Sequence, residues 1–61
     1  MAQITEKELS ALNDLLGAEQ LQVTKYQAAA QKCNDTALAD CYNQMAQRHQ
    51  RHFDQLFTNL K

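Results

Sequence analysis

Apolar residues recur every three or four positions along the first half of the chain, which is the period of one face of an α-helix. The steps alternate between three and four without a break over residues 9–33, as do the a and d positions of a coiled coil. The series consists of Leu9, Leu12, Leu16, Glu19, Val23, Tyr26, Ala30 and Cys33. Glu19 is its only charged member, so the pattern predicts an amphipathic helix that carries one acidic side chain on its apolar face.

A broader apolar stripe with the same helical period follows in residues 38–60. Its members are Leu38, Cys41, Tyr42, Met45, Ala46, His49, His52, Phe53, Leu56, Phe57 and Leu60. Both histidines of the chain lie on this stripe. The pattern predicts a second amphipathic helix. With nine Ala, nine Gln, eight Leu and no Pro, the chain favours helix almost throughout, and the predicted fold class is all-α.

Residues typical of helix ends set the boundaries of the two helices. Thr5 followed three residues later by Glu8 matches the capping box, which places the first helical residue near Glu6. Asn34 suits a left-handed C-cap, and Asp35 suits the N-cap of a second helix. The sequence therefore predicts helices over about 6–33 and 36–60, which form a single helical-hairpin domain covering residues 1–61.

An antiparallel hairpin that turns at Asn34 and Asp35 brings together residues whose numbers add up to about 69. This rule pairs apolar with apolar side chains: Leu9 with Leu60, Leu12 with Leu56 or Phe57, Leu16 with Phe53, Val23 with Met45 or Ala46, and Tyr26 with Tyr42. The same rule places Glu19 level with His49 and His52. Three ionisable side chains are thus expected to meet at one level of an otherwise apolar contact.

Two helices alone cannot cover apolar stripes of this width, because each helix has only one neighbour. A 61-residue chain also has a marginal core unless disulfides, a metal or a partner subunit support it. We therefore expect a homodimer that forms a four-helix bundle, with two copies of the polar layer near its two-fold axis. The expected interface consists of Leu9, Leu12, Leu16, Val23, Tyr26, Tyr42, Met45, Phe53 and Leu56.

Composition and charge exclude several other functions. A net charge of −1, from six Lys and Arg against seven Asp and Glu, provides no basic surface for nucleic acid. The chain has no apolar run long enough for a membrane span and no signal-peptide pattern, so an intracellular location without membrane contact is expected. No nucleophile motif or phosphate-binding loop is present, so no catalytic residues and no enzyme activity are predicted. Cys33 and Cys41 are interpreted as small buried hydrophobic residues.

Four segments resemble a known family. Ile4-Thr-Glu-Lys-Glu-Leu9, Glu19-Gln-Leu-Gln-Val-Thr-Lys-Tyr26, Cys33-Asn-Asp35 and His49-Gln-Arg-His52 are similar to small spore coat proteins of the coat F type. The resemblance covers nearly the whole chain. It implies a ferritin-like helical fold, a structural role in the protein coat of bacterial endospores, and other coat proteins as partners.

Glu19, His49 and His52 form the candidate site, and its role has more than one interpretation. They form either a buried polar layer that fixes helix register and oligomeric state, or a divalent-metal site for Zn or Fe at the dimer interface. General acid–base chemistry and an adaptor that binds another helix are further alternatives. Ferritin-like di-iron sites use four Glu and two His. This chain has His49 where that pattern has Glu, which argues against iron redox chemistry.

Overall fold

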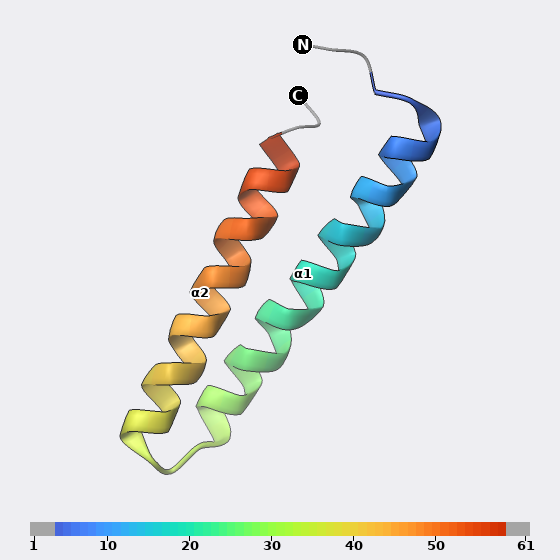
Figure 1. Ribbon diagram of the computed structural model, residues 1–61. Helices are drawn as coiled ribbons and strands as arrows, with labels where there is room; N and C mark the ends of the chain where they lie inside the picture. The colour runs from blue at the N-terminus through green and yellow to red at the C-terminus, as the bar shows by residue number, and fades with distance from the viewer. Residues whose placement is uncertain (1–3, 59–61) are drawn as a thin grey trace.

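The fold is an antiparallel pair of α-helices. The computed structural model describes residues 4–58 of the chain. Helix α1 spans Glu6–Lys32 and helix α2 spans Thr36–Thr58. The helices lie side by side with a short connection at one end (Figure 1). Residues 4–58 contain no strand, which confirms the predicted all-α hairpin.

The start of α1 is a complete capping box, as the sequence predicts. The backbone N–H of Glu8 donates to the Thr5 hydroxyl oxygen at 3.1 Å, and the backbone N–H of Thr5 donates to the Glu8 carboxylate at 3.2 Å. Hydrogen bonds from Thr5, first from its side chain and then from its backbone, lower the pKa of Glu8 below its ordinary value of 4.5.

The connection between the helices differs from the prediction. Helix α1 ends at Lys32, and Cys33 caps it in an extended conformation, with φ −86° and ψ 126°. No residue in the described range 4–58 has a positive φ, so the predicted left-handed C-cap at Asn34 is wrong. The N–H of Cys33 instead donates to the Ala30 carbonyl at 3.4 Å, which tightens the last turn and lets the chain leave α1 extended.

Asp35 caps the N-terminus of α2, as predicted. Its carboxylate accepts the backbone N–H of Leu38 at 2.9 Å, and its carbonyl accepts the N–H of Ala39 at the same distance. The helix dipole also stabilises the negative charge of the Asp35 carboxylate at this N-terminal position. The predicted end of this helix near Leu60, and the pairing of Leu60 with Leu9, lie outside the described residues.

The contact between the helices follows the predicted register. Four side chains are buried in it: Leu12, Leu16, Val23 and Ala46. Tyr26 faces Tyr42 as expected, with ring centroids 6.0 Å apart. The helix faces that carry the two apolar stripes are therefore the faces that pack together.

The hairpin is only one layer thick, with extents of 47 × 16 × 10 Å. Many large apolar side chains therefore remain exposed: Ile4, Leu9, Leu15, Leu21, Leu38 and Phe57. Cys41 is also exposed and Cys33 is half-buried, so the interpretation of Cys41 as a buried hydrophobic residue is wrong for the single hairpin. Every residue that becomes ordered in the two helices costs conformational entropy, and burial of apolar side chains has to offset this cost. A core of four residues is small for two helices of this length.

Candidate functional site

Glu19 lies in the middle of the buried face of α1. Leu16 precedes it by about one turn and Val23 follows it by about one turn, and both of these side chains are buried. On α2, His49 and His52 occupy the level that the antiparallel register places opposite Glu19. The carboxylate is thus held between apolar layers and has two imidazoles within reach.

Both histidines bind the same carboxylate through the same ring atom. Nδ1 of His49 lies 3.2 Å from Oε1 and 3.3 Å from Oε2 of Glu19, and Nδ1 of His52 lies 2.9 Å from Oε2. Because a carboxylate accepts hydrogen bonds, each ring donates from its Nδ1–H. One hairpin therefore brings the three predicted site residues together without a partner chain.

The two histidines differ in their surroundings. The side chain of His49 is 19% exposed and that of Glu19 is 18% exposed, whereas that of His52 is 48% exposed. The His52 ring meets the His49 ring edge to face at a centroid distance of 5.7 Å. His49 is thus the inner member of the cluster and His52 is the member on the solvent side.

Tyr26 covers the inner histidine. Its ring stacks on the ring of His49 with a centroid distance of 5.7 Å and an interplanar angle of 7°. The sequence predicts that Tyr26 faces Tyr42. The contact with His49, about two turns further along α2 than Tyr42, depends on the rotamers of both rings. The stacking holds the plane of the His49 ring, and the contacts with the Glu19 carboxylate orient its Nδ1.

The cluster leaves no buried polar atom without a partner. Within residues 4–58, no buried side-chain nitrogen or oxygen lacks a hydrogen-bond partner. The three side chains also present the kinds of atom that bind divalent metals, since one carboxylate oxygen and two imidazole nitrogens lie within 4.8 Å of one another. The arrangement therefore suits both a stable polar layer and a metal site.

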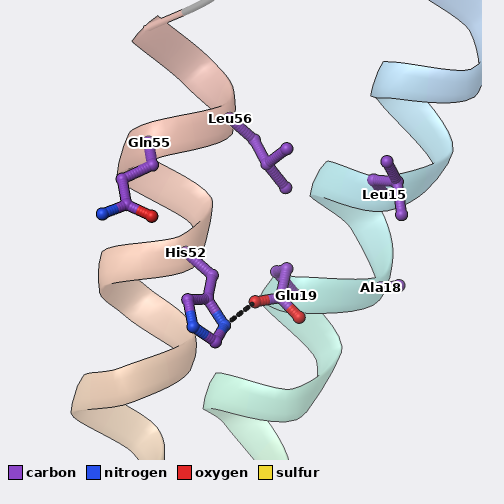
Figure 2. Close-up of a pocket in the computed structure, with 6 residues that line it drawn as sticks. All are labelled: Leu15, Ala18, Glu19, His52, Gln55 and Leu56. Carbon is purple, nitrogen blue, oxygen red and sulfur yellow. Dashed lines mark hydrogen bonds and ion pairs between the residues drawn. The ribbon is translucent and has the colours of Figure 1, made fainter.

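A groove opens beside the cluster on one side of the helix pair. It has a volume of about 360 Å³ and is lined by Leu15, Ala18, Glu19, His52, Gln55 and Leu56. Figure 2 shows Leu56 and His52 reaching from α2 towards α1, with Glu19 pointing to meet His52. Most of the lining is hydrocarbon, so we call this the apolar groove. Leu15, Ala18 and Gln55 lie off the two main apolar stripes, so the spacing of apolar residues does not mark them as site residues.

A second groove of about 330 Å³ is lined by Val23, Gln27, Asn43, Ala46, Gln47 and Gln50, and we call it the polar groove. Ala18 and Gln27 are two and a half helical turns apart on α1, and the same separation divides Asn43 from His52 on α2. The two grooves therefore lie on opposite sides of the contact between the helices.

Other sequence features contribute no site. Arg48 and Arg51 are exposed, while His49 and His52 turn towards Glu19, so the basic-looking segment divides into two faces. The amide of Gln50 donates to Asp54 at 3.0 Å within α2, away from the cluster. Neither helix of the described chain is long and apolar enough to cross a membrane.

Comparison of the chain with protein-family models, with curated proteins and with solved structures gives no match. The assignment of a function therefore depends on the hairpin, its two grooves and the Glu19, His49 and His52 cluster.

Proposed function

We propose that this protein is a non-catalytic structural unit that associates with a second copy of itself to form a four-helix bundle. The observation that carries the proposal is the apolar side of the hairpin. Leu15 of α1 is 53% exposed beside the apolar groove. On α2, further apolar residues recur at helical spacing along the side of the hairpin that faces the same way as this groove. These residues are Leu38, Cys41, Met45 and Leu56.

A second copy is the occupant that best fits this surface. Within residues 4–58 the hairpin buries only four side chains, and chains of this size commonly reach stability by oligomerisation. Covering one Leu side chain contributes roughly 1.5–3 kcal/mol. Two-fold symmetry places every such residue in the interface twice, so each apolar residue on this surface contributes twice to the stability of the dimer.

The assembly that we propose for this unit is a protein coat of the spore-coat type. The segments around Glu19, Tyr26, His49 and His52 resemble small coat proteins of the coat F type, and a self-associating helical unit suits a structural layer. Other coat proteins are the expected partners beyond the dimer. In this role the polar cluster fixes register, because any axial slip leaves Glu19 without its two histidines.

A second candidate function is the binding of a divalent metal, Zn²⁺ or Fe²⁺, by Glu19, His49 and His52. The specific observation in its favour is that one hairpin holds three ligand atoms within 4.8 Å. With a single carboxylate, the cluster lacks the acidic ligands that ferritin-like proteins use to bridge two irons.

Native mass spectrometry of the untagged protein tests both functions in one experiment. The structural proposal predicts a dimer of the 7.0 kDa chain at micromolar concentration. A monomer that persists at the highest soluble concentration would contradict it. Mass added in steps of one metal ion supports the second function. Sedimentation velocity in solution is the control for dissociation in the gas phase.

A further inference from the structure

We infer that each hairpin binds one zinc ion through Glu19, His49 and His52, at a site that is complete within a single chain and has one coordination position open to the apolar groove. The inference rests on the second proposed function. It adds the identity of the ion, the number of ions per chain and the coordination geometry.

The spacing of the ligand atoms fits a tetrahedral ion. Zinc binds nitrogen and oxygen at about 2.0–2.2 Å, so two ligand atoms at the tetrahedral angle lie roughly 3.3–3.5 Å apart. In the hairpin, Oε2 of Glu19 lies 3.3 Å from Nδ1 of His49 and 2.9 Å from Nδ1 of His52. All three atoms lie within 4.8 Å of one another. Small side-chain rotations therefore make room for an ion, and neither helix has to move.

The hydrogen bonds within the cluster keep the ligands aligned. Both Nδ1 atoms point at the carboxylate, and the stacked Tyr26 ring holds the plane of His49. Zinc takes the place of the proton on each Nδ1, and each ring stays neutral by carrying its proton on Nε2. Two neutral imidazoles and one carboxylate form a ligand set that is typical of zinc sites.

The surroundings of the cluster leave room for one further ligand. Buried Leu16 and Val23 close it on either side along α1, and Tyr26 covers His49. The remaining open side is the apolar groove, where His52 is exposed. Three protein ligands with one free position distinguish reactive zinc sites from closed structural sites, which use four. Water or a small anion fills such a position.

Zinc titration followed by native mass spectrometry tests the number of ions, because monomer and dimer peaks are resolved separately. We expect one zinc on each monomer and two on each dimer. We expect His52→Ala and Glu19→Gln to weaken zinc affinity by more than about 100-fold, since removing even an outer hydrogen-bonding partner of a ligand costs 10–100-fold. Gln55→Ala is the matched control, because Gln55 lines the same groove without contributing a ligand atom to the cluster. Circular dichroism checks that each variant is helical.

Cobalt substitution tests the geometry independently. A four-coordinate site gives Co²⁺ intense visible absorption, and His52→Ala should abolish it. The weak absorption of six-coordinate Co²⁺ would overturn the single open position. Zinc on dimers alone, at one ion per two chains, would overturn the single-chain site and leave metal binding standing. No zinc on any species, with zinc in large excess, would overturn the inference, and a parallel titration in which Fe²⁺ also fails to bind would overturn the second proposed function.

Discussion

The two grooves of the hairpin have nearly the same volume, about 360 Å³ and 330 Å³, but different linings. The apolar groove has Leu15, Ala18 and Leu56, whereas the polar groove has three glutamines and an asparagine. Amide side chains form hydrogen bonds with water, so their exposure costs little free energy. Exposed hydrocarbon cannot form these bonds, and its hydration is unfavourable. The lining of the apolar groove is therefore the part of this surface that we propose to be covered in a closed two-fold dimer, in which the same surface of both copies is buried.

The largest expected effect comes from making the apolar groove resemble the polar one. Leu15→Gln removes one exposed Leu from each copy at the proposed interface. The dimer should be weakened by about 3 kcal/mol, or roughly 100-fold in Kd. Sedimentation velocity over a range of protein concentrations measures this change.

The matched control for this variant is the reverse change on the opposite side, Gln27→Leu, which should leave the Kd of the dimer unchanged. If Gln27→Leu alters association as strongly as Leu15→Gln does, the two grooves do not differ as proposed.

The second expected effect separates the two histidines. His49 is the more buried and stacks on Tyr26, whereas His52 opens to the apolar groove. His49→Ala should lower the free energy of unfolding by about 2 kcal/mol, through lost packing and hydrogen bonding. His52→Ala should cost less than about 1 kcal/mol, because solvent replaces much of what it loses.

Urea denaturation at one fixed protein concentration compares these two variants, since the stability of a dimer depends on concentration. If both variants lose the same free energy of unfolding, His49 and His52 do not differ as inner and outer members of the cluster.

The third expected effect concerns a position outside both grooves. A Cβ atom added at Gly17 meets nothing within 4 Å. Gly17→Ala should therefore raise the free energy of unfolding by about 1 kcal/mol through helix propensity alone. Thermal denaturation measures the gain, and the dimer Kd should not change. A weaker dimer would reveal a helix contact at Gly17 and would place the interface on a third side of the hairpin.

The smallest expected effect lies at the start of α1, away from both grooves. Hydrogen bonds from Thr5 lower the pKa of Glu8 in the folded state. The folded state therefore gains stability from Glu8 above pH 4.5, the ordinary pKa, and loses it as the pH falls through the lowered value. Glu8→Gln should remove this part of the pH dependence in urea denaturation between neutral and acidic pH. An unchanged profile would contradict the assigned hydrogen bonds.

Much of the hairpin follows from residues that are close together in the sequence. The capping box of Thr5 and Glu8 and the N-cap of Asp35 depend on side chains that reach backbone three residues away, so sequence spacing predicts them directly. The register also follows, because a short connection leaves little freedom in how the helices align. That register placed Glu19 level with His49 and His52 and Tyr26 opposite Tyr42, as the structure confirms.

The exit from α1 shows where local pattern was insufficient. Asn34 has the side chain for a left-handed cap, but Cys33 leaves the helix in an extended conformation. Asn34 tolerates the left-handed conformation but does not require it. The connection between the helices has only three residues, and it has to place Asp35 at the N-cap of α2.

The sequence by itself therefore determined the two helices, their order and the level at which their polar side chains meet, because each of these depends on spacing along the chain. Only the tertiary structure decided that both histidines present Nδ1 to one carboxylate, that Tyr26 covers His49 and that His52 faces the apolar side. These features depend on how far each helix is rotated about its own axis when the apolar side chains interlock. That rotation is set by packing between the helices, and it separates an apolar groove from a polar one of similar size.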